Sequence, residues 1–190
     1  VLIIGTMVIY KQLTFLQNKN LGFDQSQLIS VKMMFSLREN PEPMKRDLQN
    51  HSSIVSVASA SNNLVDVNNS TYSIKWEGQA DGDEFLMSLA NVDRNYLQTT
   101  GMKLIAGRNF DPKISTDTSS AYIINESAAK RMGWTAEEAI DKSFTLWESP
   151  GRVIGVIEDF HFHKLTAVIE PFVLYNWPRD IYSTLLVKTQ

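Results

Sequence analysis

The feature that most constrains the fold is residues 153–163, where a short apolar segment ends abruptly in polar and aromatic residues. Residues 153–157 are Val-Ile-Gly-Val-Ile, and they follow a Ser-Pro-Gly turn sequence at residues 149–151. A β-branched run of this length bounded by turn residues predicts a buried strand. That strand would deliver the next residues to one edge of a sheet, and they are Glu158, Asp159, Phe160, His161, Phe162 and His163. The edge is either a chemical site or a structural corner, and the residue types alone leave both interpretations open.

Length and composition are those of a folded domain. The chain has 190 residues, of which 43% are hydrophobic and 21% charged, which is enough for one good core or two small ones. The net charge is −3 and the lysines and arginines are scattered, so we expect no nucleic-acid partner. The chain has no cysteine, which excludes disulfides, thiolate metal ligands and a cysteine nucleophile.

Residues 1–20 begin as an almost continuous apolar run and become amphipathic after residue 10. A membrane-spanning helix needs about 20 apolar residues, and this run supplies about half of them. Tyr10 and Lys11 suit a membrane boundary, where an aromatic ring and a cation lie at the level of the lipid headgroups. We therefore predict that residues 1–20 are the end of a transmembrane helix and its stalk, that Gly22 ends the helix, and that the chain is part of a longer protein.

The residue pattern of this terminus also fits two other structures. One is a buried amphipathic helix of the domain itself. The other is a signal peptide, which is disfavoured because no basic region precedes the apolar run and no small-residue cleavage site follows it.

The first third of the chain predicts a split βαβ unit. Residues 27–35 are β-branched and apolar and form a first strand, and residues 54–57 form a second. Between them, Asn40 is expected to cap a helix that begins with a proline and ends near residue 50. A strand, a helix and a strand within about 35 residues are typical of an α+β layer.

The middle of the chain is richer in strand patterns. Alternating residues at 71–76 and 84–92, separated by a turn with two glycines, predict a β-hairpin. Asp93 is expected to cap a short helix. Asn125 follows a strand and is expected to cap a helix of residues 126–132.

Two charged features allow a binding interpretation beside a structural one. The carboxylates of Asp81, Asp83 and Glu84 resemble part of a calcium loop, but the glycine and terminal glutamate of such a loop are missing, so a solvated turn is favoured. Arg108 follows a glycine and has the chemistry to bind an anion, but no glycine-rich loop or second base accompanies it. A salt bridge or a carbonyl contact is favoured for Arg108.

The histidines raise the question of a metal-dependent enzyme. His161 and His163 share a face if the segment is extended, and Glu158 or Asp159 would complete a zinc ligand set. Catalytic zinc sites usually take three protein ligands, and His51 is the one further histidine. The sequence also lacks the Gly-x-Ser-x-Gly pattern of a serine nucleophile. A structural role, in which Asp159 caps a turn and the phenylalanines fill the core, is therefore favoured.

Six short motifs occur in an order found in one family of membrane proteins, at residues 22–24, 93–96, 106–110, 124–129, 132–134 and 154–162. Together they resemble the extracytoplasmic (periplasmic) core domain of MacB/FtsX-like ABC transporter permeases. We interpret the residues that match family motifs as turn, capping and packing residues, and they are Gly107, Arg108, Asn125, Glu126, Gly155, Asp159 and Phe160. The resemblance implies no catalytic residue, no cofactor and no metal.

The resemblance also implies the architecture, an α+β fold of two lobes with an N-terminal stalk helix. We expect one lobe to comprise residues 21–60 and 120–190. The other lobe is expected to be a β-rich inserted subdomain of residues 61–119.

The function that the resemblance implies is mechanical. The domain would lie on the periplasmic side of the cell inner membrane, held by flanking helices, and would transmit ATP-driven motion to a substrate or an extracytoplasmic partner protein. A cytoplasmic ABC ATPase subunit or domain would hydrolyse ATP, because this chain has no Gly-x-x-x-x-Gly-Lys-Ser/Thr loop. We therefore expect the chain not to be an enzyme. The alternatives are a soluble extracytoplasmic ligand-binding module, which requires residues 1–10 to be buried in the domain, or a metal-dependent enzyme that uses His161 and His163.

Overall fold

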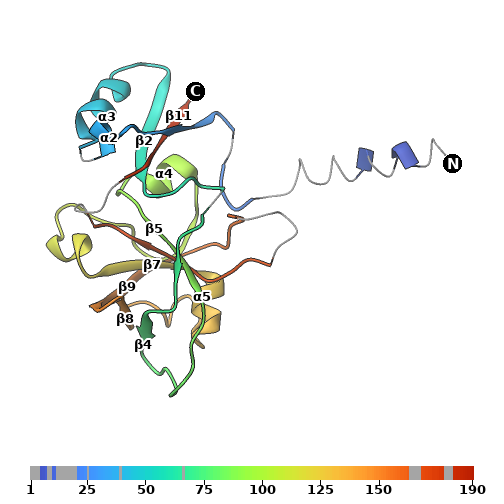
Figure 1. The fold of residues 1–190 in the computed structure, drawn as a ribbon, viewed down its shortest axis with the longest axis vertical. Coiled ribbons are helices and arrows are strands. Elements are labelled where there is room, and N and C mark those ends of the chain that lie inside the picture. Colours follow the sequence, from blue (N-terminus) through green and yellow to red (C-terminus); the bar gives the residue numbers. More distant parts are fainter. Residues whose placement is uncertain are drawn as a thin grey trace.

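The computed structural model describes residues 5–7, 10–11, 21–24, 26–38, 40–65, 67–162, 168–177 and 182–190. These residues form two sheets stacked along the long axis of the molecule, with short helices around them (Figure 1). The helices are α2 (Phe35–Arg38), α3 (Glu42–Gln49), α4 (Tyr96–Thr100) and α5 (Glu126–Arg131), with a 3-10 turn at Ser115–Thr118. The fold is thus α+β, as predicted.

The smaller sheet has three strands in the order β1 (Leu28–Lys32), β11 (Thr184–Thr189) and β2 (Ile54–Ala60). Both outer strands run antiparallel to β11, so β1 and β2 are parallel to each other and α3 connects them. This confirms the split βαβ unit, since a later strand lies between the two. Its helical cover is α3, which packs Met44 and Leu48 against Val57 and Val187.

The larger sheet has eight strands. Seven follow the order β3 (Ser70–Thr71), β5 (Met87–Asn91), β10 (Phe172–Tyr175), β7 (Ala121–Asn125), β9 (Ser149–Ile157), β8 (Ser143–Leu146) and β4 (Ile74–Trp76), and β6 (Leu104–Gly107) also pairs with β9. Residues 153–157 are completely buried or nearly so in the middle of this sheet, as their composition predicts. β3 and β4 lie at opposite ends of the order although only residues 72–73 separate them, so the sheet must curl.

Each face of the larger sheet carries its own core. One face packs against the smaller sheet and α4, in a cluster that joins Ile123, Ile157 and Leu174 to Ala58 and Leu186. The other face packs against α5 and the curled end of the sheet, and this second cluster is made of Trp76, Tyr122, Phe144, Ala128, Met132 and their neighbours.

Three local predictions need correction. The predicted hairpin of residues 71–76 and 84–92 pairs only at β3 and β5, because Ile74 and Trp76 turn into the second core and β4 pairs with β8 instead. Asn40 does not cap α3, since the N-cap position is Pro41 and no side chain bonds the helix end. α4 begins later than predicted, with Asn95 at the N-cap position.

The sheets also divide the chain differently from the expected lobes. Strands β3 to β6 come from residues 61–119, but they share one sheet with β7 to β10, which come from the segment after residue 120. The smaller sheet combines residues 28–60 with the last strand. The reason is that β7, β9 and β10 are buried on both faces and need pairing partners on both sides, which β5, β6 and β8 supply.

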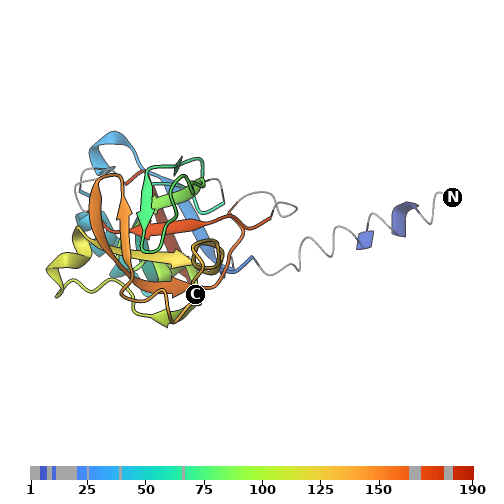
Figure 2. The same cartoon turned by 90° about the horizontal axis from the view of Figure 1, so that it is seen from below.

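The described part of the N-terminus is helical and exposed. Residues 5–7 and 10–11 are helical, and Met7 and Tyr10 are 64% and 70% exposed. Figures 1 and 2 show these pieces well away from the two sheets. A soluble module would bury this segment, so its exposure does not support that alternative. Among the described residues, no helix is both long and apolar enough to cross a membrane.

Candidate functional site

Asn125 lies at the point where β7 becomes α5 and has hydrogen bonds to three segments. Its side-chain oxygen accepts from the Ala128 amide at 3.0 Å, so it caps α5 as predicted. The same oxygen accepts from the Phe172 amide at 2.8 Å, and the side-chain nitrogen donates to the Glu170 carbonyl at 3.0 Å. A fully buried asparagine therefore joins β7, α5 and the start of β10.

Asp159 follows β9 and completes this polar cluster. One carboxylate oxygen accepts from the Asn125 side chain at 2.8 Å and from the Ser127 amide at 2.9 Å. The other accepts from the Ser127 hydroxyl at 2.6 Å, and the Asp159 amide donates to the Glu126 carboxylate at 3.2 Å. Asp159 thus reaches the edge where α5 begins, and its hydrogen bonds are those of a structural corner. A carboxylate and a helix start also attract each other electrostatically.

Phe160 lies on the other side of the same corner. It is buried, and its ring packs on Phe162 and Phe172 with centroid distances of 5.3 and 5.0 Å. Phe162 and Phe172 are also in contact, so the three rings form one triangle inside the core between the sheets.

The corner also holds the segment through which the N-terminus enters the domain. Gly22 has φ of +81°, and a Cβ there would lie 2.4 Å from the Asp159 carbonyl oxygen and 2.6 Å from the Cα of Phe160. The His161 amide donates to the Leu21 carbonyl at 2.8 Å. Only glycine permits this close approach, so residues 21–22 are fixed against the motif that follows β9.

Asp24 extends this attachment to α4 and to the smaller sheet. Its amide donates to the Thr100 carbonyl at the end of α4, at 2.8 Å. Its carboxylate bonds Lys188 of β11 at 2.6 Å and the Ser26 hydroxyl at 2.6 Å. The Lys188 hydrogen bond, with those of Ser26, lowers the pKa of Asp24 to about 2. We call Leu21, Gly22, Phe23 and Asp24, with Asp159, Phe160, His161 and Lys188, the entry junction.

Gly107 and Gly155 form a second close contact, where β6 pairs with β9. Gly107 has φ of +74°, and a Cβ there would lie 2.2 Å from the Ile154 carbonyl oxygen. A Cβ on Gly155 would lie 2.6 Å from the Arg108 carbonyl oxygen. Both glycines therefore allow two backbones to approach more closely than side chains permit.

Arg108 forms the ion pair that was favoured over anion binding. Its guanidinium makes two hydrogen bonds to Asp117, at 2.5 and 2.9 Å, and these raise the pKa of Arg108. The Asp117 carboxylate is 1% exposed and also accepts from the Asp111 amide at 2.8 Å. The guanidinium thus fixes the loop after β6.

A buried ion pair between Lys45 and Asp93 was not foreseen. Lys45 of α3 bonds the Asp93 carboxylate at 2.6 Å, with side-chain exposures of 6% and 11%. The same carboxylate accepts from the Ser59 amide of β2 at 2.8 Å. Asp93 therefore holds α3 to the body of the domain. A lysine on an eight-residue helix carries no sequence signal of burial, because lysines usually lie in solvent.

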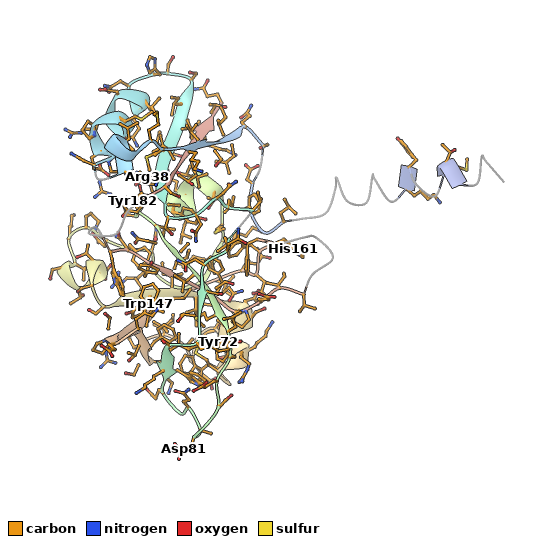
Figure 3. The ribbon with its side chains drawn as sticks, in the orientation of Figure 1. Arg38, Tyr72, Asp81, Trp147, His161 and Tyr182 are labelled. Carbon is orange, nitrogen blue, oxygen red and sulfur yellow. The ribbon has the colours of Figure 1, made fainter. Side chains whose placement is uncertain are left out.

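The acidic turn and the histidines do not assemble into a described metal site. Asp83 pairs with Arg131, with both side chains more than a third exposed. Within the described ranges, no three His, Cys, Asp or Glu side chains are grouped closely enough to hold a metal ion. His163 lies outside the described residues, and His161 is part of the entry junction through its amide (Figure 3).

Comparison with known proteins gives one consistent result. A family model described as the MacB-like periplasmic core domain matches residues 2–190. The periplasmic region of MacB from Actinobacillus actinomycetemcomitans has a similar structure, with a TM-score of 0.58 and 17% identity over 91% of this chain and 79% of that one. The extracellular domain of the noncanonic ABC-type transporter YknZ from Gram-positive bacteria gives a TM-score of 0.55 and 16% identity, over 86% and 82%. No curated protein sequence matches the chain.

Proposed function

This chain belongs to the family of MacB-like periplasmic core domains, and from that premise we propose that it transmits ATP-driven motion of an ABC-type permease to a substrate or partner protein outside the membrane. The motion would come from a cytoplasmic ATPase subunit or domain. The domain would lie on the periplasmic side of the inner membrane and would be moved by its flanking helices.

The entry junction is the observation that carries this proposal. A domain that is moved by a helix needs a firm attachment at the point where that helix enters. Here the Gly22 backbone lies against Asp159 and Phe160, and Asp24 bonds both Thr100 and Lys188. The attachment therefore reaches both sheets through buried or charge-assisted contacts, so a displacement of residues 21–24 is passed on to the whole domain.

The family-motif residues fit a mechanical role better than a chemical one. Asn125, Asp159 and Arg108 all use their polar atoms on neighbouring backbone or side chains. The bonds of Asn125 and Asp159 stiffen the corner between β7, β9 and α5, and those of Arg108 fix the loop after β6, so these residues do not present reactive groups to a substrate. We therefore propose that the domain has a mechanical role in a permease rather than an enzymatic activity that uses the histidines.

The proposal is tested by loosening the attachment in the complete permease. Four glycines inserted between residues 20 and 21 leave the domain intact but separate it from its helix. Spin labels at Gln79 and on a rigid part of the cytoplasmic ATPase report their distance with and without ATP. We expect an ATP-dependent change in the parent protein and its loss in the insertion variant, with ATP hydrolysis retained.

The matched control is the same insertion between Ala80 and Asp81, in an exposed turn at the far end of the domain (Figure 3). The distance change, read from a label at Ser52 in this variant, should persist. If the insertion after residue 20 leaves the ATP-dependent change as large as before, the entry junction does not transmit the motion.

A further inference from the structure

Strand β4 ends the larger sheet with an unpaired edge. Among the described residues it pairs only with β8, in the register Lys75 opposite Thr145. The Trp147 amide donates to the Ser73 carbonyl and the Glu77 amide to the Ser143 carbonyl. Because hydrogen-bonded pairs alternate in an antiparallel ladder, residues 73, 75 and 77 face β8, and the backbone groups of residues 74 and 76 face away from it.

Only two of the four outward groups remain available. The Ile74 amide donates to the Tyr72 carbonyl, and the Trp76 carbonyl accepts from the Gln79 amide. The Ile74 carbonyl and the Trp76 amide have no hydrogen-bond partner in the described part of the chain. A carbonyl at one residue and an amide two residues later are the pair of groups that one residue of a parallel strand uses.

A hollow of about 700 Å³ is lined by residues of β4, of β8 and of the turn that follows β8. We call it the β4 hollow, and its lining includes Tyr72, Lys75, Gln79, Glu84, Trp147 and Glu148. Tyr72 is 60% exposed, which is unusual for a large ring, and Figure 3 shows it and Trp147 in the lower half of the molecule. The aromatic rings offer flat apolar surface to a ligand.

The turn that brings Trp147 and Glu148 to the β4 hollow is held in an uncommon conformation. Both residues have positive φ, +48° and +27°, where a hairpin turn normally has asparagine and glycine. Trp147 is fixed there by ring contacts with Tyr175 and Trp177, both at 5.7 Å. Non-glycine residues in such conformations occur preferentially at binding sites.

We propose that the β4 edge and its hollow bind an extended peptide segment of a partner protein, as an added parallel strand that carries a basic side chain. The bound residue opposite Lys75 donates its amide to the Ile74 carbonyl and accepts from the Trp76 amide. Glu84 and Glu148 outnumber Lys75 in the lining, so a Lys or Arg side chain is favoured.

A second copy of this chain is a poor occupant of the same edge. Two copies related by a twofold axis would pair their β4 strands antiparallel, and the free Ile74 carbonyl and Trp76 amide allow this only in the register that places Lys75 of one copy opposite Lys75 of the other. Like charges directly opposite each other destabilise a strand pair. The proposal does not depend on the mechanical function, because it concerns the end of the sheet away from the entry junction.

The test uses the peptide Ac-Arg-Val-Thr-Val-Thr-NH2, whose central threonine would lie opposite Lys75 and whose arginine would lie opposite Ser73, and the 190-residue chain, followed by backbone amide NMR. We expect saturable shifts at Tyr72, Lys75, Trp76 and Trp147. An analogue with an N-methylated amide at the central threonine should bind about 3- to 10-fold more weakly, the effect of one lost hydrogen bond. Replacing the arginine by glutamate should weaken binding further.

Paired variants separate this site from non-specific attraction to acidic surfaces. Glu148→Gln should weaken the binding of the arginine peptide several-fold and reduce the salt dependence of this binding. Glu137→Gln makes the same charge change at an exposed residue outside the β4 hollow and should have no effect.

Any of four outcomes would overturn the proposal. The first is an equal affinity for the peptide and its N-methylated analogue. The second is that the NMR shifts map outside the β4 hollow, or that no shifts occur at millimolar peptide. The third is saturable shifts at Tyr72 and Trp147 with chitotriose in place of the peptide, which would assign the hollow to sugars. The fourth is sedimentation showing that the chain dimerises through β4.

Discussion

At the scale of single residues, Asp159 stabilises the polar corner that surrounds it through its hydrogen bonds. Asp159 accepts three hydrogen bonds from two residues of the β7–α5 connection. If the carboxylate is removed, the amide and the hydroxyl of Ser127 lose their hydrogen-bond acceptor. Asn125 then keeps only its other hydrogen bonds.

Asp159→Ala is therefore expected to lower the free energy of unfolding by about 2–4 kcal/mol. Urea unfolding followed by circular dichroism measures it. Asp47→Ala is the control, since Asp47 is exposed on α3, and it should change the free energy by less than about 0.5 kcal/mol. Equal effects of the two substitutions would refute a structural role for Asp159.

Two glycines with the same backbone conformation should respond very differently to alanine. Gly107 and Gly78 have φ of +74° and +84°, but only at Gly107 would a Cβ meet backbone, 2.2 Å from the Ile154 oxygen. Gly78→Ala should cost about 1 kcal/mol, the price of positive φ alone. Gly107→Ala should cost at least about 3 kcal/mol in the same urea experiment, because β6 and β9 must separate. Similar losses of stability at both positions would show that the contact between β6 and β9 tolerates a side chain.

At the scale of elements, α3 is held to the domain by a buried charge pair as well as by apolar contacts. Burial raises the pKa of Asp93 even though Lys45 and two backbone amides favour its ionised form. The contacts to the Asp93 carboxylate thus compensate only in part for its removal from water, a common result for buried ion pairs.

Lys45→Met is expected to lower the free energy of unfolding by about 3–5 kcal/mol, because it leaves a buried carboxylate without its cation. Adding Asp93→Asn should restore more than half of that loss, since the asparagine oxygen still accepts from Ser59. Lys103→Met, at an exposed pair with Glu158, should cost less than about 1 kcal/mol. Additive losses in the double variant would contradict this account.

The contact between Asp24 and β11 should make the attachment of the N-terminal segment sensitive to acid. Hydrogen bonds from Lys188 and Ser26 lower the pKa of Asp24 from 3.8 to about 2. A lowered pKa stabilises the folded state above the unfolded pKa, and this stabilisation is lost as the pH falls from about 4 to about 2. Since Asp24 is half exposed, the effect is small.

Asp24→Asn should consequently be less stable than the parent protein at pH 7, and the difference should shrink between pH 4 and pH 2. Thermal unfolding of both proteins across this range measures it. A difference that stays constant down to pH 2 would show that the Lys188 contact does not depend on the charge of Asp24.

At the scale of the whole molecule, the two sheets share a core, and the segments that build them are interleaved along the chain. Strands from residues 61–119 pair with strands that come after residue 120, and Ala58 and Leu186 pack against Ile123 and Leu174. The chain should therefore unfold as one cooperative unit.

A fragment of residues 61–119 tests whether that segment is an independent subdomain. We expect the fragment to be unfolded by circular dichroism, because β4, β5 and β6 lose their partners β8, β10 and β9. The full chain under the same conditions is the control. A cooperative unfolding transition in the fragment would support the two-lobe division predicted from the sequence.

Elements that are specified by a few consecutive residues can be predicted from the sequence alone. The apolar run at 153–157 is a buried strand, Asn125 caps α5, and the first two strands with α3 form a split βαβ unit. In each case the periodicity or the cap is encoded within a few consecutive residues, and the motif order also indicated the family. The pairing of the strands depends on the tertiary structure. The sequence around β4 is compatible with pairing to β5 or to β8, and the choice depends on where the side chains of Ile74 and Trp76 are buried in a core. The same holds for the Lys45–Asp93 pair and for the junction of Gly22 with Asp159, since contacts between residues 48 and 137 positions apart leave no mark on local sequence.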